Sequence, residues 1–281
     1  STAGGAGIQL AYKTALDNFI KNGNNRVILC TDGDFNVGTS SDDALVKLIE
    51  EKRNDDVFLS ILGFGRGNYQ DQKMEKLSNA GNGNYAYIDN LLEAQKVLVS
   101  EMGGTLLTIA KDVKIQIEFN PAVVQSYRLI GYENRMLKSQ DFNDDKKDAG
   151  ELGAGHTVTA IYEIVPANGE NAKTNALIDP LKYQTSQLTP EALKKGEWAT
   201  VKFRYKPPTA DESILLERVV TGQDLYRVSN NFRFSASVAY FGMLLRESEF
   251  IQEDFGYDEA ILLAKSGIGL DAKGYRKECI E

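Results

Sequence analysis

Apolar and polar positions follow two different periods along this chain, and the change of period divides it. Over residues 1–104, helical spacing alternates with short apolar runs, a pattern typical of a parallel sheet covered by helices. The spacing predicts helices over residues 6–22, 41–49, 72–80 and 91–102, and strands over residues 27–31, 57–63 and 84–88. These segments predict an α/β unit with three strands.

From Thr105 the apolar positions recur every second residue, which is typical of strands with one buried face and one solvent-exposed face. Residues 105–228 therefore predict an antiparallel β-sandwich. Its strands are expected over residues 113–119, 123–132, 158–164, 199–205 and 214–220. Residues 229–281 predict a C-terminal helical element, whose apolar stripe is expected to pack on the sandwich. That stripe contains Phe234, Val238, Phe241, Leu244 and Leu245.

The composition of the chain argues against some classes of binding partner. The 281 residues are 42% hydrophobic and 26% charged, with a formal net charge of −8. The acidic balance and the lack of a basic cluster on any predicted helix argue against nucleic acid and anionic membranes as partners. No apolar run is long enough to cross a membrane. The two cysteines give no disulfide framework, and Cys30, inside an apolar run, is expected to be a small buried hydrophobe.

The candidate chemistry lies at the end of the first strand. The run Val27 to Cys30 ends in Thr31-Asp32-Gly33, which would deliver the Asp32 carboxylate to the carboxyl edge of a parallel sheet. Upstream, Thr2 opens a glycine-rich turn that leads into the first helix. A hydroxyl and a carboxylate are suitable ligands for a hard cation. The alternative is that Thr2 only caps its helix and Asp32 only organises a turn.

These segments resemble the von Willebrand factor type A domain, which has a Rossmann-like fold and binds a metal ion at an adhesion site. Thr2 matches that family's threonine loop and Asp32 its strand-end aspartate, whereas its Asp-x-Ser-x-Ser loop is absent from this chain. Residues 1–104 would then be the C-terminal part of such a domain, in an N-terminally truncated chain. The resemblance implies Mg²⁺ or Mn²⁺ in the full-length protein, none in this chain, and a protein partner whose carboxylate completes the metal shell.

A truncated sheet would expose the strand that carries Asp32 as an edge, and an exposed apolar edge invites pairing with another strand. We therefore expect an upstream segment or another chain to cover it. Three further segments are similar in sequence to bacterial cell-envelope proteins in which a type A domain precedes a domain of unknown function. These segments are residues 110–116, 127–134 and 149–156. That resemblance implies protein binding without catalysis. It also implies that the protein is located at the cell envelope or outside the cell. A lipid anchor on an upstream segment would be one means of attachment to the envelope.

Two other functions remain open at the level of sequence. Asp32 and Asp34 have the spacing of the nucleophile and general acid of haloacid-dehalogenase-type phosphatases. A metal-independent structural subunit of the envelope would instead use the sandwich and the helices as its interface. A single histidine, His156, gives no support to a catalytic triad or a zinc site. The acidic loop over residues 143–148 lacks the spacing of a calcium loop and is expected to be solvated.

Overall fold

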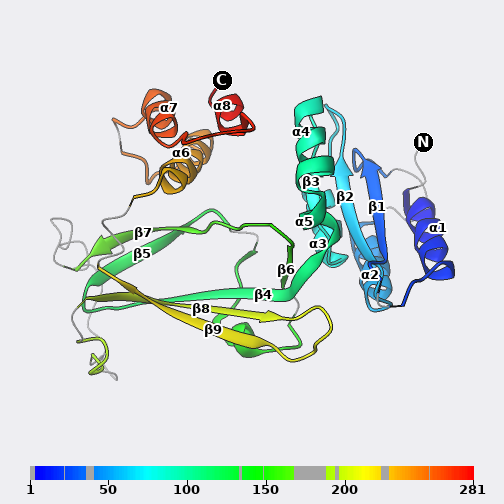
Figure 1. The fold of residues 1–281 in the computed structure, drawn as a ribbon, viewed down its shortest axis with the longest axis horizontal. Coiled ribbons are helices and arrows are strands. Elements are labelled where there is room, and N and C mark those ends of the chain that lie inside the picture. Colours follow the sequence, from blue (N-terminus) through cyan, green and yellow to red (C-terminus); the bar gives the residue numbers. More distant parts are fainter. Residues whose placement is uncertain are drawn as a thin grey trace. The chain divides into compact units, whose positions relative to one another are not determined.

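The computed structural model describes residues 4–21, 23–35, 41–132, 135–147, 149–167, 188–193, 196–222, 228–252 and 254–281. Figure 1 labels the helices and strands. Contacts group the chain into two units. The first contains residues 1–114, 140–157 and 203–215, and the second contains residues 115–139, 158–202 and 216–281. Both helices and strands occur, so the chain is a mixed α/β protein. The three-domain division at residues 104 and 228 stays a prediction.

The first unit contains a parallel sheet in the order β1-β2-β3, as the sequence predicts. Strand β1 spans Arg26–Thr31, β2 spans Phe58–Gly63 and β3 spans Tyr85–Tyr87. At the carboxyl edge Thr31 lies opposite Gly63, and Gly63 lies opposite Tyr87. Strand β1 is therefore an edge strand of the described sheet.

Helices cover the two faces of this sheet unequally. Helices α1 (Gly4–Asp17), α2 (Asp42–Arg53) and α3 (Asp71–Ala80) bury their apolar residues against one face. That core includes Ile8, Tyr12, Leu45, Ile49, Leu59, Ile61, Met74 and Leu77. On the other face, η1 adds Val97 to a smaller cluster with Leu62 and Ile88. The predicted closing helix is divided into α4 (Leu91–Gln95), the π-helix η1 (Lys96–Ser100) and α5 (Met102–Leu106).

Two expectations for this unit are wrong. Cys30 is exposed, as is Ile28 (46%), because the smaller cluster covers β2 and β3 but not this face of β1. The first helix ends at Asp17, before the predicted residue 22. The side chain of Asn25 accepts a hydrogen bond from Ile20 N and donates one to Ile20 O, both at 2.9 Å, which stabilises a turn there instead.

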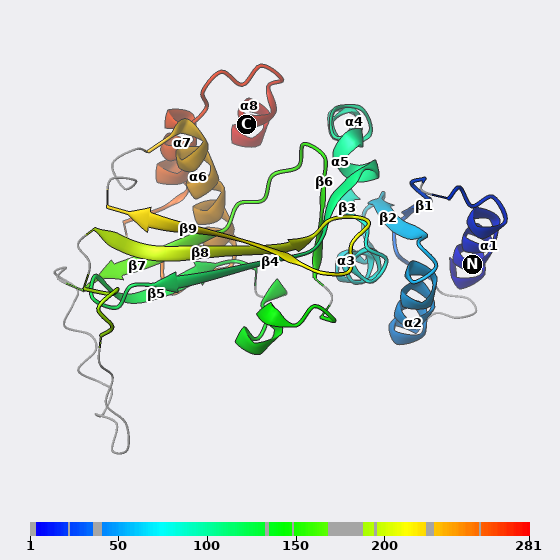
Figure 2. The same ribbon diagram turned by 60° about the horizontal axis from the view of Figure 1, so that its bottom comes forward.

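The remaining strands form two sheets (Figure 2). One has the order β6-β4-β8-β9, with β6 at Gly150–Gly153, β4 at Thr108–Phe119, β8 at Glu197–Lys206 and β9 at Ile214–Thr221. The other pairs β5 (Val124–Ile130) with β7 (Ile161–Pro166). The β4–β6 and β5–β7 pairs are antiparallel, as predicted. The packing of these sheets as a sandwich stays a prediction.

A β-bulge in β4 disturbs the predicted alternation at Lys114 and Ile115. Asp112 has a φ of 50°, and the pairing register shifts between Ala110 and Val113. An extra residue in a strand changes which face the next side chains occupy. Lys114 is consequently 2% exposed, whereas Ile115, expected to face the core, is 45% exposed.

The C-terminal helices are α6 (Asn230–Leu245), α7 (Tyr257–Ser266) and α8 (Tyr275–Ile280). The Ser229 side chain caps α6 by accepting a hydrogen bond from Phe232 N at 3.1 Å. Helix α6 packs against α7, but Val238, Phe241 and Leu245 remain exposed, so their predicted burial is wrong. Helix α7 therefore covers less than the full apolar stripe of α6. None of the described helices has the length and apolar character needed to cross a membrane.

Candidate functional site

The candidate site is the carboxyl edge of the parallel sheet, where β1 ends. The backbone N of Phe64 donates to Thr31 O at 2.9 Å, which extends the β1–β2 pairing by one residue. Asp32 follows immediately and is half-buried. Asp32 therefore lies at the carboxyl edge, where the sequence places it, because the parallel strand β1 ends at a turn there.

Among the described residues, one oxygen of the Asp32 carboxylate has a hydrogen-bond donor and the other has none. Its Oδ1 accepts a hydrogen bond from Asp34 N at 3.1 Å, and Gly33 between them has a φ of 82°, which favours glycine. Its Oδ2 accepts no hydrogen bond from any residue that the structure describes. Asp32 thus organises its turn, as the simpler interpretation expects, and still leaves an oxygen available to a ligand.

A second loop, residues 64–70, packs against the Asp32 turn and is called the β2–α3 loop. Gln70 N donates to Asp32 O at 2.9 Å, and Asn68 Nδ2 donates to Asp34 Oδ2 at 2.7 Å. A Cβ on Gly65 would lie 3.3 Å from Asp32 Cβ. The β2–α3 loop was not predicted to take part in the site, since its residues carry no periodic signal.

Tyrosines anchor the β2–α3 loop to the sheet. The Tyr69 hydroxyl lies over Gly63, where a Cβ would overlap it, and shares a hydrogen bond with the Tyr85 hydroxyl. Tyr85 in turn donates to Asp71 Oδ1 at 2.6 Å. Burial, together with this hydrogen bond to Asp71, raises the pKa of Tyr85 well above its usual range. The chain of hydroxyls therefore stays protonated and holds the loop in place.

The start of α1 lies beside the same site. A Cβ on Gly4 would come within 2.6 Å of Phe35 Cγ, so the helix packs on the buried ring three residues beyond Asp32. Thr2 lies outside the described residues. Gly4, the first described residue, packs on Phe35, which follows the Asp32 turn.

The described residues fit a cation only in part. Asp32 offers a hard oxygen ligand at an open edge, as Mg²⁺ or Mn²⁺ requires. Among the described residues, however, no group of three His, Cys, Asp or Glu side chains could hold a metal ion. A complete shell would need hydroxyl ligands from elsewhere, as the sequence resemblance implies. The phosphatase alternative stays untested, and Asp34 Oδ2 is occupied by Asn68 in this arrangement.

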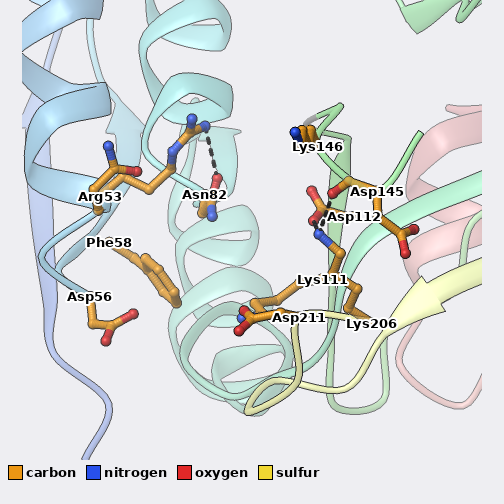
Figure 3. A pocket seen from close by; sticks show the side chains of 11 residues that line it. Arg53, Asp56, Phe58, Asn82, Lys111, Asp112, Asp145, Lys146, Lys206 and Asp211 are labelled. Carbon is orange, nitrogen blue, oxygen red and sulfur yellow. Dashed lines mark hydrogen bonds and ion pairs between the residues drawn. The ribbon is translucent and has the colours of Figure 1, made fainter. Parts of the chain in front are cut away.

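A polar cavity of about 310 Å³ lies elsewhere in the first unit (Figure 3). Four cationic and four anionic side chains line it, so its formal charges balance. They are Arg53, Lys111, Lys146 and Lys206 with Asp56, Asp112, Asp145 and Asp211. The closest pair, Lys206 Nζ and Asp112 Oδ2, lies 2.8 Å apart. Sequence reasoning missed this cavity because its residues come from five separated segments.

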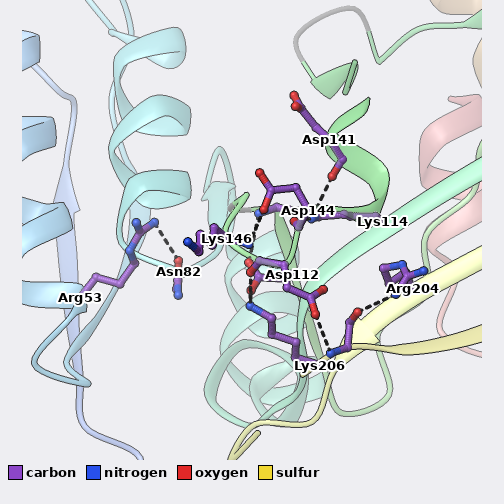
Figure 4. Close-up of polar contacts among 12 residues, drawn as sticks. Arg53, Asn82, Asp112, Lys114, Asp141, Asp144, Lys146, Arg204 and Lys206 are labelled. Carbon is purple, nitrogen blue, oxygen red and sulfur yellow. Dashed lines mark hydrogen bonds and ion pairs between the residues drawn. The ribbon is translucent and has the colours of Figure 1, made fainter. Parts of the chain in front are cut away.

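Beside this cavity, backbone carbonyls of residues 141–145 bind two lysine ammonium groups (Figure 4). Lys114 Nζ donates to Asp141 O at 3.2 Å and Asp144 O at 2.5 Å, and Lys206 Nζ donates to Asp145 O at 2.6 Å. The sequence predicts only a solvated loop here. The structure instead holds this part of the loop in place through hydrogen bonds from the ammonium groups of Lys114 and Lys206. Asp148 lies outside the described residues.

Electrostatics reinforce the arrangement. A hydrogen bond from Ser213, with Lys206 and Arg204 nearby, lowers the pKa of Asp145 from its usual value. Burial disfavours the Lys206 ammonium, but its hydrogen bond to Asp112 and the surrounding carboxylates raise its pKa overall. Both groups are therefore held in their charged forms.

Comparison with known proteins identifies relatives of uncharacterised function. The profile of the family described as "Uncharacterized protein YfbK, C-terminal" matches residues 104–281. The chain is also 44% identical over 280 residues to "Uncharacterized protein YfbK" of Escherichia coli (strain K12). That alignment covers 100% of this chain and 48% of the relative, so the chain spans about half the length of this curated relative.

Among solved structures, a "von Willebrand factor type A from Catenulispora acidiphila" matches with a TM-score of 0.38 and 13% sequence identity. The match covers 96% of this chain and 60% of that chain. A likeness of this size carries no argument about the fold or the function. The predicted domain of unknown function is confirmed by the family match, while truncation of the chain stays a prediction.

Proposed function

The chain belongs to the YfbK C-terminal family through residues 104–281, and we propose that the preceding α/β part contributes to a divalent-cation-assisted protein-binding site. The site is of the adhesion type and non-catalytic. Asp32 and Thr2 are its ligands from this chain, and Mg²⁺ or Mn²⁺ is its cation in the full-length protein.

One observation carries this proposal: Asp32 lies at the carboxyl edge of a parallel sheet, with Oδ1 bonded by Asp34 N and no described residue donating to Oδ2. Ligands of open α/β sheets bind at that edge. When bound, the cation would supply a positive charge that attracts a carboxylate of the protein partner. The β2–α3 loop holds the Asp32 backbone through Gln70 N, and Asp34 N orients the Asp32 carboxylate, which favours binding of a ligand at this position.

The environment of the site completes the proposal. We place the protein at the bacterial envelope or outside the cell, with a lipid anchor on an upstream segment as one means of attachment. The missing hydroxyl ligands come from an upstream Asp-x-Ser-x-Ser loop. The same upstream segment, or another chain, covers the edge of β1.

A second candidate function is a metal-independent structural subunit of the envelope. The exposed face of β1 favours it, because Ile28 and Cys30 are exposed beside a strand edge that no other described strand pairs. Such an edge can bind another strand through backbone hydrogen bonds alone. The two functions differ in whether binding requires the cation.

The test is a titration of Mg²⁺ and Mn²⁺ against the melting temperature, in this chain and in a chain extended upstream to include the hydroxyl loop. A ligand at 100 times its Kd stabilises the native state by about 2.7 kcal/mol. Asp32→Asn keeps an acceptor for Asp34 N while removing the charge, and Asp34→Asn is the matched control. We expect a rise in the extended chain that Asp32→Asn abolishes and Asp34→Asn retains. No rise in the extended chain would refute the metal-dependent function.

A further inference from the structure

The β2–α3 loop carries a cationic side chain that the site itself does not use. Arg66 is exposed, and none of the residues that the structure describes forms a hydrogen bond, ion pair or ring contact with its guanidinium. By contrast, the nearby Lys73 ammonium lies over the Phe35 ring, 5.0 Å from its centre. A guanidinium without a partner, next to a candidate ligand site, is available to an incoming group.

The loop backbone is built to present this residue. Gly65 and Gly67 flank Arg66 with φ values of 120° and 89°, a region that favours glycine. The Tyr87 hydroxyl donates to Gly65 O at 3.0 Å, which fixes the first of these two positions. Arg66 therefore lies at the tip of a turn whose base is tied to β3.

The same loop brings the backbone next to Arg66 close to the Asp32 turn. A Cβ on Gly65 would lie 3.3 Å from Asp32 Cβ, and Gln70 N donates a hydrogen bond to Asp32 O. Phe64, at the start of the loop, is 38% exposed, and Tyr87 is exposed to a similar degree. The loop that contacts the Asp32 turn thus carries a cationic side chain without a partner among the described residues, together with the partly exposed ring of Phe64, and Tyr87 is bonded to it.

We propose that the β2–α3 loop selects an acidic segment of the protein partner, with Arg66 binding one of its carboxylates beside Asp32. This inference rests on the proposed function. A guanidinium binds a carboxylate through two parallel hydrogen bonds, which fixes orientation as well as charge. A partner with one carboxylate toward the cation and another toward Arg66 is bound in a single register, with its apolar atoms against Phe64. Arg66 determines specificity and is not a metal ligand.

The probe is a capped peptide of alternating Asp and Ala, with a peptide of alternating Lys and Ala as its negative control. Its affinity is measured by fluorescence anisotropy at low salt, once in EDTA and once in Mg²⁺, for this chain and for the chain extended upstream. Arg66→Glu reverses the charge and Arg66→Lys keeps it. Arg218→Glu, an exposed arginine on β9 with no described partner, is the matched control.

We expect Arg66→Glu to weaken binding by about fivefold or more and Arg218→Glu to change it by less than about twofold. Arg66→Lys should retain most of the affinity but lose part of the selectivity for closely spaced carboxylates. The dependence on Arg66 should fall as salt rises, since an exposed charge pair is screened. Equal effects of Arg66→Glu and Arg218→Glu in both chains would overturn the inference.

The two proposals fail separately in this design. If Mg²⁺ strengthens peptide binding through Asp32 but Arg66→Glu has no effect, the cation site stands and the role of Arg66 is wrong. If Arg66→Glu weakens binding while Mg²⁺ changes nothing in the extended chain, Arg66 selects acidic segments without a cation. An unchanged melting temperature in Arg66→Glu confirms that the variant folds.

Discussion

Replacement of Gly63 by alanine tests whether the tyrosine anchor holds the β2–α3 loop. A Cβ at Gly63 would overlap the Tyr69 hydroxyl and lie 2.7 Å from Tyr69 Cζ. The ring must therefore move, which breaks its hydrogen bond to Tyr85. Overpacking costs about 1–3 kcal/mol, and a lost hydrogen bond adds about 1 kcal/mol.

The expected loss is thus about 3 kcal/mol, which corresponds to a fall of roughly 6–12 °C in melting temperature for a unit of this size. Urea unfolding followed by circular dichroism measures the free energy. Gly7→Ala is the matched control, because Gly7 lies in α1 with nothing within 4 Å of an added Cβ. Alanine is the better helix former there, so this control should stabilise the protein by about 0.5–1 kcal/mol.

A double-mutant cycle decides the cause. In a Tyr69→Ala background the overlapping ring is absent, so Gly63→Ala should cost less than about 1 kcal/mol. If Gly63→Ala destabilises both backgrounds equally, the clash with Tyr69 is not the cause and the anchor argument is refuted.

Three other changes are expected to alter stability in defined ways. Lys114→Met removes the ammonium bound by the loop carbonyls and should destabilise by about 1–3 kcal/mol, with faster amide exchange over residues 139–147. Asp145→Asn removes a carboxylate whose pKa is lowered on folding. Its stabilising effect is present above the ordinary pKa of 3.8 and is lost as pH falls, so the variant should show a flatter loss of stability below about pH 4. Gly83→Ala places a Cβ over the Leu59 carbonyl and 2.9 Å from Ser60 N, and should cost more than about 3 kcal/mol.

Each of these has a simple contrary result. Unchanged exchange over residues 139–147 in Lys114→Met would show that the carbonyls do not depend on the ammonium. For Asp145→Asn, the reference variant is Glu217→Gln on β9. If the free energy of unfolding falls in the same way at acidic pH in both variants, the lowered pKa of Asp145 does not contribute to stability. If Gly83→Ala unfolds at the same urea concentration as the wild type, the backbone of the turn after α3 can move to accommodate the added Cβ.

The sequence predicted elements well where a period was sustained. The parallel strands β1 and β2 and the antiparallel pairs follow from runs of apolar residues or from alternation. Asp32 could be placed at the sheet edge because an apolar strand ended in turn residues. These signals are local, so one stretch of chain is enough to read them.

Other features depend on distant residues and left no local signal. The bulge at Asp112 buries Lys114, and nothing in the alternating run from residue 112 to 119 indicates where the register shifts. The exposure of Cys30 depends on whether other elements cover that face of β1. The tyrosine anchor brings Tyr69 and Tyr85 together through the fold, since sixteen residues separate them in sequence.

The exposed thiol of Cys30 can report, through its rate of alkylation, whether this face of β1 is covered. Thiol reactivity depends on access as well as on the thiolate fraction. An alkylating reagent should modify Cys30 rapidly while this face of β1 is open, and slowly once a neighbouring segment covers it. Cys279, also exposed but on α8, provides an internal standard in the same tube. A ratio of two alkylation rates therefore reports occupancy of the strand without any knowledge of what occupies it.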